Sequence, residues 1–275
     1  MEHWICVACG TQFAASQQPP SSCPACEDER GPLSDERPRW TTLAQMRQDG
    51  FHTVFQEHEP GLVGIGTVPD FAIAQRALLV HTPQGNILWD CIPYLDDATV
   101  AAVKRLGGIR ALAISHPHYY SSMVEWANTF DAPIYLHQAD QQWVMRPHQR
   151  ITFWSGDTFP LVDGVELIRL GGHFPGGTVL HWKHAKDGKG VLLSGDIISV
   201  IPHRHRVTFM YSYTTLLPLP ASEIHHIRAT IMLYDFDRLY SAWFKREIPA
   251  DASTVVLNSA DRYLRMLESF EGGEQ

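Results

Sequence analysis

The stretch Ala111-Leu112-Ala113-Ile114-Ser115-His116-Pro117-His118 is an apolar segment that ends in two histidines spaced two residues apart. A short apolar run of this kind is typical of a buried β-strand. Successive side chains of an extended segment point to opposite faces, so residues i and i+2 share one face. We therefore expect His116 and His118 to present their imidazole rings together at the end of a strand.

Two further apolar runs end in residues of the same chemical kind. The run 165–170 leads through two glycines into His173, and the run 191–194 leads through Gly195 into Asp196. Glycine lets the backbone turn tightly and approach an ion closely, because it has no Cβ. Imidazole and carboxylate groups are the ligands of catalytic zinc and of non-haem iron. Each piece is a weak signal alone, but the three strand ends together predict one metal site. Its predicted ligands are His116, His118, His173 and Asp196.

The order of these pieces, with the strands and helices between them, resembles the metallo-β-lactamase superfamily, including its glyoxalase II and persulfide dioxygenase branches. The resemblance covers most of the chain from about residue 40 onward. His173 matches the third histidine of the family, and Asp196 matches its bridging aspartate. The resemblance implies two mixed β-sheets flanked by helices, a four-layer αββα sandwich, whereas periodicity alone predicts a mixed α/β chain.

The chain departs from the family at the second metal position. The first family motif reads His-x-His-x-Asp-His, and this sequence has Tyr120 and Ser121 where the family has aspartate and histidine. The last family ligand is a histidine just after the final core strand, and the corresponding stretch 236–244 contains none. The resemblance therefore implies a degenerate second site and a mononuclear centre.

A single metal ion can polarise a substrate and lower the pKa of bound water to about 7. We expect a small-molecule substrate whose ester, thioester, amide or related bond is hydrolysed by a metal-bound hydroxide. In this reading Asp196 binds the metal and orients the hydroxide. Tyr120 is the second candidate catalytic residue, because a phenol can donate to a developing oxyanion or act as an acid. An equal alternative is that the Tyr120 ring only fills the space of the missing metal.

Two other function classes stay open. Without His118, the remaining ligands form the facial triad of two histidines and one carboxylate found in non-haem iron oxygenases. The persulfide dioxygenase branch is similar in using such a triad, so the chain could be an iron oxygenase or oxidoreductase with its amino-terminal segment as electron carrier. The third class is a non-catalytic metal-binding scaffold. The predicted core ligands fit one zinc ion and one iron ion equally well.

The amino terminus carries a separate metal motif in two Cys-x-x-Cys pairs: Cys6 with Cys9, and Cys23 with Cys26. Four thiolates in paired knuckles are typical of a structural tetrahedral zinc site. The sequences of the two pairs, Cys-x-x-Cys-Gly and Cys-Pro-x-Cys, resemble those of a zinc ribbon or a rubredoxin. Rubredoxins usually have a longer loop between the pairs, so zinc is favoured over iron. Two disulfides would need an oxidising compartment, and no apolar signal segment precedes the first pair.

A ribbon this short cannot bury enough apolar surface to fold unaided, so we expect metal binding to supply much of its folding free energy. Residues 1–30 hold four acidic residues and one arginine, and the formal net charge of the chain is −8. Phosphate contacts need basic residues, so we expect no nucleic-acid partner. A structural role, or contact with a protein partner or a second copy, ranks above electron transfer through bound iron.

With 275 residues, of which 44% are hydrophobic, the chain can hold one sizeable core in addition to the ribbon. No apolar stretch reaches the 18 or so residues that a membrane span needs, so a cytoplasmic protein without a membrane partner is expected. The Pro-containing joint at residues 31–38 cannot pack as a regular element. It predicts a ribbon domain over residues 1–38 and a metallo-β-lactamase-like domain over 39–275.

The pattern of apolar residues, caps and glycines also predicts individual elements. A helix ending at Phe130 should be capped by Ser121 or Ser122, and two strands should form a hairpin around Gln84-Gly85. Further helices are predicted over 42–48, 221–232 and 252–270, and another opens with residues 96–103 and is stopped by Gly107-Gly108.

Several other histidines are candidate ligands. His203 and His205 lie in a His-Arg-His-Arg run that could bind an anionic substrate group or reach the metal, although a basic surface loop is favoured. His225 and His226 are neighbours on a predicted helix, so their side chains point about 100° apart and do not both face one ion. His181 is expected to be exposed near a turn at Asp187-Gly188.

Overall fold

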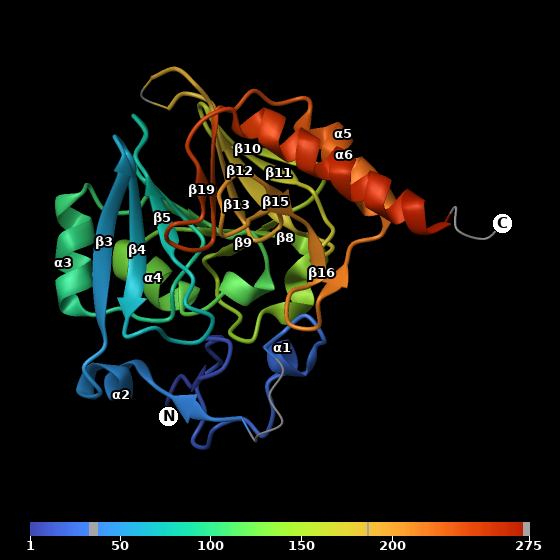
Figure 1. The fold of residues 1–275 in the computed structure, drawn as a ribbon. Helices are drawn as coiled ribbons and strands as arrows, with labels where there is room; N and C mark the ends of the chain where they lie inside the picture. Colours follow the sequence, from blue (N-terminus) through green and yellow to red (C-terminus); the bar gives the residue numbers. More distant parts are fainter. Residues whose placement is uncertain (33–37, 186, 272–275) are drawn as a thin grey trace. The chain divides into compact units, whose positions relative to one another are not determined.

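The fold comes from a computed structural model, which describes residues 1–32, 38–185 and 187–271. The chain divides into two compact units, Met1–Ser155 and Gly156–Gln275. Each unit is built on one large β-sheet, of seven strands in the first unit and six in the second. Figure 1 shows the course of the chain through these elements.

Within the first unit, the amino-terminal segment is joined by backbone pairing to the chain that follows it. β1 (Ile5–Cys6) pairs antiparallel with β2 (Trp40–Thr41), and the short helix α1 (Pro24–Glu27) begins directly after Cys23. β2, which pairs with the strand that contains Cys6, thus lies after the predicted domain boundary at residue 38. Residues 33–37 of the predicted joint lie outside the described residues, so the boundary at residue 38 stays a prediction.

The sheet of the first unit contains the strand predicted from the stretch 111–118. Its strands follow the order β3-β4-β5-β6-β7-β8-β9. They are β3 (His52–Glu59), β4 (Leu62–Val68), β5 (Ala77–Val80), β6 (Ile87–Trp89), β7 (Ala111–Ala113), β8 (Ile134–His137) and β9 (Ile151–Trp154). The strands from β3 to β6 pair antiparallel, and those from β6 to β9 pair parallel. β7 is buried along its length, and the chain leaves it toward the two histidines.

Parallel neighbours need crossover connections, and helices provide them here. They are α3 (Asp97–Arg105), α4 (Met123–Phe130) and the 3-10 helix η2 (Gln138–Trp143), while the 3-10 helix η1 (Pro117–Tyr119) contains His118 and α2 (Leu43–Gln48) precedes β3. The Asp96 carboxylate caps α3 by accepting from Thr99 N at 2.7 Å. Ser122 stands at the cap position of α4, but the prediction that a serine side chain caps this helix is wrong. The Ser122 hydroxyl donates instead to Pro93 O at 2.7 Å.

The sheet of the second unit has the order β10-β11-β12-β13-β18-β19. Its strands are β10 (Thr158–Val162), β11 (Val165–Arg169), β12 (Thr178–Trp182), β13 (Val191–Gly195), β18 (Arg238–Ser241) and β19 (Glu247–Ile248). Only β13 and β18 pair parallel within this sheet. Their connection contains the hairpin of β14 (Ser199–Val200) with β15 (Val207–Thr208), the hairpin of β16 (Met210–Ser212) with β17 (Leu217–Pro218), and helix α5 (Ala221–Ile231).

The long helix α6 (Ala252–Glu271) covers this part of the chain together with α5 (Figure 1). Ile224 and Ile227 of α5 and Val256 and Ala260 of α6 are buried in one apolar cluster with the sheet. Burying an isoleucine or valine side chain stabilises the fold by about 1.5–3 kcal/mol relative to exposure. Of the helices in the described part of the chain, none combines the length and apolar character needed to cross a membrane.

Candidate metal centres

The four ribbon cysteines come together, as their spacing predicts. One ligand atom from each of Cys6, Cys9, Cys23 and Cys26 lies within 4.8 Å of the others. The two knuckles are built alike, since Gly10 N donates to Cys6 O at 2.8 Å and Glu27 N donates to Cys23 O at 3.0 Å. Sγ–Sγ distances of 3.6 Å for Cys6–Cys26 and Cys9–Cys23 are far longer than the S–S bond of about 2.05 Å in a disulfide.

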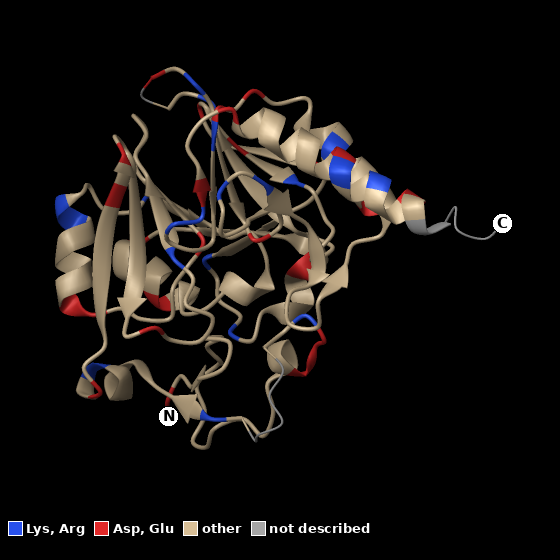
Figure 2. Ribbon diagram, in the orientation of Figure 1, with Lys and Arg blue, Asp and Glu red and all other residues tan. Residues whose placement is uncertain are grey.

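The four thiols of the ribbon are strongly coupled. Hydrogen bonds among them lower the pKa values of Cys6 and Cys23 below the ordinary value and raise those of Cys9 and Cys26. A thiolate, not a thiol, is the form that binds a metal. Figure 2 shows acidic residues gathered at the end of α1 with a basic neighbour. There the Arg30 guanidinium bonds Asp28 at 2.6 Å and lowers the pKa of that carboxyl, with a further contribution from His118.

The ribbon contacts the segment that follows His118. Gln12 N donates to Ser121 O at 3.3 Å, and Ala14 N donates to Met145 O at 3.1 Å. Gly10 adopts a φ of +80°, and a Cβ on it would lie 2.7 Å from Pro93 Cγ, so only glycine allows this close approach. The ribbon is therefore packed on the first unit beside the histidine loop.

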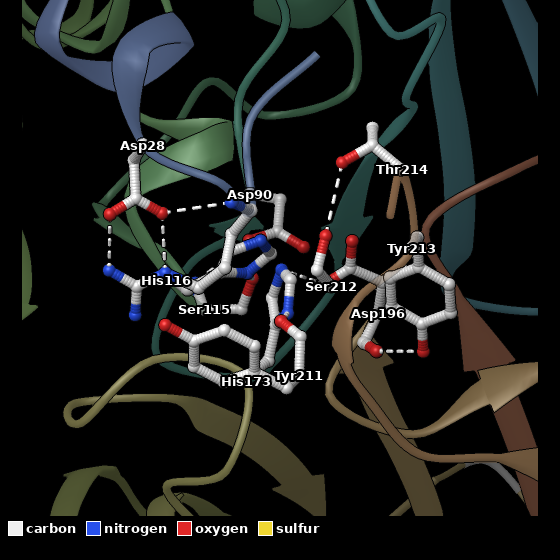
Figure 3. Close-up of polar contacts among 11 residues, drawn as sticks. Asp28, Asp90, Ser115, His116, His173, Asp196, Tyr211, Ser212, Tyr213 and Thr214 are labelled. Atoms are coloured by element: carbon white, nitrogen blue, oxygen red, sulfur yellow. Dashed lines mark hydrogen bonds and ion pairs between the residues drawn. The ribbon is translucent and has the colours of Figure 1, made fainter. Parts of the chain in front are cut away.

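His116 and His118 follow β7 closely, but the strand already ends at Ala113 and His118 lies in η1 rather than in extended chain. Only 1% and 6% of their surfaces are exposed. Their ring centroids are 5.1 Å apart. Asp90 supports this turn, because its Oδ1 accepts from Ser115 N at 2.8 Å, and Ser115 Oγ lies 2.9 Å from His116 Nδ1 (Figure 3). When Nδ1 donates to that hydroxyl, Nε2 carries the lone pair that a metal requires.

In the second unit, His173 and Asp196 lie close together although 23 positions separate them in the sequence. His173 Nε2 is 3.8 Å from Asp196 Oδ1. His173 Nδ1 donates to Tyr211 O at 2.7 Å (Figure 3). Because a carbonyl oxygen only accepts, this bond places the proton on Nδ1 and leaves Nε2 as the ligand atom. Gly172 holds the turn with a φ of +76°, where a Cβ would lie 2.9 Å from Leu219 Cδ1.

The four predicted core ligands form the second group of metal-binding type in the described residues. One ligand atom from each of His116, His118, His173 and Asp196 lies within 4.8 Å of the others, and all four residues are buried. Three nitrogens and one carboxylate oxygen at this spacing fit a four-coordinate zinc site, or an iron site with open positions. The residues therefore suit the metal predicted from the strand ends.

The positions of the missing second site are occupied by buried residues with other contacts. Tyr120 is 3% exposed, and burial, with a smaller contribution from Asp140, raises the pKa of its phenol. Ser121 Oγ accepts from Gln75 Nε2 at 2.9 Å. The remaining candidate histidines are exposed and belong to neither metal-binding group: they are His203, His205, His225 and His226.

Sequence reasoning missed the residues that orient the ligands. The hydroxyl of Ser115, directly before His116, was a signal that could have been used. The Tyr211 carbonyl could not have been found, because any residue supplies a carbonyl and only the fold brings it to His173. His181 was expected to be exposed and is instead 7% exposed, with Nε2 at 2.9 Å from Asp235 O.

The chain is 48% identical to YmaE of Bacillus subtilis (strain 168) over 270 residues, which cover 98% of this chain and 98% of that protein. The chain belongs to the YmaE family. The identity of this chain with YmaE extends over almost the whole length, so it includes the ribbon as well as the two large sheets. YmaE is itself described as an uncharacterized protein, and no protein-family model matches this chain.

Solved structures similar to this YmaE-family chain include metallo-β-lactamases. DIM-1 metallo-β-lactamase has a TM-score of 0.58 at 12% identity, over 79% of this chain and 98% of its own. VMB-1 at pH 5.5 has a TM-score of 0.58 at 13% identity, over 80% and 99%. A B3 metallo-β-lactamase with an active-site glutamic acid has a TM-score of 0.51 at 14% identity, over 86% and 97%. The predicted metallo-β-lactamase fold is thus confirmed, and the glyoxalase II branch stays a prediction.

Proposed function

We propose that this YmaE-family chain is a metal-dependent hydrolase with a mononuclear core site. The observation that carries the proposal is the buried group of His116, His118, His173 and Asp196 at metal-binding distances. The fold shared with metallo-β-lactamases such as DIM-1 supports hydrolysis of a small-molecule substrate as its reaction. A bound metal would polarise the scissile carbonyl and lower the pKa of water to about 7.

The protein residues contribute orientation and proton placement. The bond from His173 Nδ1 to Tyr211 O fixes the ring, so Nε2 faces Asp196 without needing to reorganise. The Asp196 carboxylate accepts hydrogen bonds only, and we propose that it orients the attacking water as well as serving as a ligand. Tyr120 is the proposed hydrogen-bond donor to the oxygen on which charge develops.

We also propose zinc as the metal of the ribbon, because four thiolates at this spacing match a structural zinc site. The core ligands accept zinc or iron. Absorption-edge scans of the purified protein would identify both metals. One zinc in the ribbon and one ion in the core are expected, and two adjacent core ions would contradict the mononuclear proposal.

Hydrolysis of an activated thioester, followed by release of the free thiol, tests the reaction. The rate should rise with pH through an apparent pKa of about 7 and should be the same without dioxygen. His173→Ala should abolish core metal and activity, while His225→Ala, which changes an exposed histidine, should retain both. Tyr120→Phe should lower turnover if the phenol donates.

The outcome also separates the proposal from its rivals. Turnover that requires iron and consumes dioxygen would replace the hydrolase with an oxygenase. A core that binds no metal while the ribbon retains zinc would favour a scaffold.

A further inference from the structure

A pocket of about 510 Å³ lies within the second unit, on the segments that follow β13 and β18. Its lining includes the aromatic residues Trp243 and Phe244 and the polar residues Tyr213, Ser199 and Arg246. A volume of this size is in the range of small-molecule sites, which are mostly apolar with a few placed polar groups.

The pocket is attached directly to the proposed metal ligand Asp196. The Tyr213 hydroxyl donates to Asp196 O at 2.7 Å, as Figure 3 shows. In addition, Ala242 N donates to Gly195 O at 2.8 Å, so the segment that leads into Trp243 is fixed to the residue before Asp196. A ligand in this pocket would therefore lie beside the backbone of Asp196.

Arg246 is the charged residue that lines the pocket, and no acidic side chain of the described residues pairs with its guanidinium. Its Nη1 is buried, and within the described ranges it has no hydrogen-bond partner. The backbone of the residue is nevertheless well held, because Arg246 N donates to Trp243 O at 3.2 Å and Arg246 O accepts from Ser241 N at 3.0 Å. A buried donor without a partner costs about 1–3 kcal/mol, and more when it is charged, so such groups call for an explanation.

Basic residues follow the pocket lining directly in the sequence. Ile201 and Pro202 line the pocket and lead into the exposed run from His203 to Arg206, which joins β14 to β15. Arg204 is paired with Glu247 at 3.2 Å, whereas Arg206 and the two histidines have no acidic side chain within ion-pair distance in the described part of the chain. Positive charge that is not paired within the protein, such as that of Arg206 and Arg246, attracts ligands of the opposite sign.

We propose that this pocket binds the carboxylate of a substrate whose body is apolar and flat, with Arg246 as the anion partner and Trp243 and Phe244 against the body. The guanidinium matches a carboxylate in geometry as well as charge. The inference rests on the proposed function only in assigning the pocket to the substrate of the metal site. It names a substrate class: esters, thioesters or amides that carry an aromatic or similarly flat carboxylic acid.

Calorimetric titration with benzoate, 3-phenylpropionate and 4-phenylbutyrate, each compared with its primary alcohol, tests the pocket directly. At least one acid should bind, and its alcohol should bind about tenfold more weakly or worse, since a hydrogen bond to a charged group is lost. Arg246→Met should lower the affinity for the acid to that for its alcohol, and Arg246→Lys should restore part of the affinity for the acid. Arg262→Met, which removes an exposed charge on α6, should bind as the parent chain does.

A carboxylate could also bind the core metal, and His173→Ala separates the two sites. Acid binding that survives His173→Ala and is lost in Arg246→Met supports the pocket even if the hydrolase proposal fails. Binding that is lost in His173→Ala but unchanged in Arg246→Met overturns the pocket and leaves the metal site standing. Binding of none of the three acids, or equal binding of acids and alcohols, also overturns it. Circular dichroism and the thermal midpoint of each variant establish that it is folded.

Discussion

Single hydrogen bonds decide which ring nitrogen of each core histidine faces the metal site. For His173 the partner is a backbone carbonyl, so the tautomer is fixed by the fold. For His116 the partner is the Ser115 hydroxyl, which can donate or accept. The orientation of His116 therefore depends on a side chain that can be removed without disturbing the backbone, because Asp90 bonds the amide of residue 115 and not its hydroxyl.

Ser115→Ala should weaken core metal binding by about 10- to 100-fold, the usual effect of removing an outer hydrogen bond from a ligand histidine. The measurement is zinc retained per chain at rising chelator concentration, with the ribbon zinc as internal reference. Ser269→Ala, at an exposed serine on α6, is the matched control. Equal retention in Ser115→Ala and the control would show that the hydroxyl does not support the ligand.

At the scale of elements, one hydrogen bond between a charged arginine and a neutral histidine links β3 to the residue before β5. Arg76 is 1% exposed, and its Nη1 lies 2.8 Å from His58 Nε2, which must accept this bond as a neutral ring. Burial, and next the charge of Arg76, lower the pKa of His58 from 6.5 to about 4. The unfolded chain therefore binds a proton at His58 between these values and the folded chain does not.

Stability contributed by the neutral state of His58 is present above pH 6.5 and is lost as the pH falls from 6.5 toward 4. His58→Gln keeps an acceptor for Arg76 but cannot titrate, so its free energy of unfolding should fall less over this range than that of the parent chain. Urea unfolding at pH 7.5, 6 and 5 measures the difference, and the other histidines are the same in both proteins. His52→Gln, at an exposed position of the same strand, should behave as the parent chain. A parallel pH dependence for His58→Gln and the parent chain would contradict the assignment.

The elements that sequence predicts well are those whose signals are local. The apolar strand at 111–114 and the helix that opens at Asp96 depend on neighbours within a few residues. The structure has β7 over Ala111–Ala113 and a helix capped by Asp96. The prediction that His181 is exposed is wrong because its ring contacts Asp235 O, from a distant part of the chain. The predicted serine cap is wrong for the same reason, since the Ser122 hydroxyl donates to Pro93 O instead of capping the helix.

For the molecule as a whole, the ribbon is both a metal site and a packed part of the first unit. The spacing of the four cysteines was enough to predict that they form one group, because the geometry of each Cys-x-x-Cys knuckle is local. It could not predict the docking of Gln12 on Ser121, or the close approach of Gly10 to Pro93, since both need the folded sheet as partner. The same limit applies to Arg246, because only the fold shows that its buried Nη1 has no hydrogen-bond partner among the described residues.

Cys23→Ser should release the ribbon metal and loosen the ribbon while the core keeps its own ion, because the sheets have separate apolar cores. Amide hydrogen exchange should rise around residues 118–125 and 145, where the ribbon makes backbone contacts. Metal analysis and exchange mass spectrometry measure both effects. Cys91→Ser, which removes a buried thiol outside the group, should retain the ribbon metal. Unchanged metal content in Cys23→Ser would refute the ribbon assignment.

The bond from Gln12 N to Ser121 O joins two segments that are synthesised at different times. The ribosome adds the four cysteines long before it adds the segment around Ser121, so the nascent ribbon has no docking surface at first. Exposed thiolates are open to oxidation in that interval, unless a metal already occupies them. Metal capture by the growing chain would thus come first, and the finished sheet would receive a ribbon that is already closed.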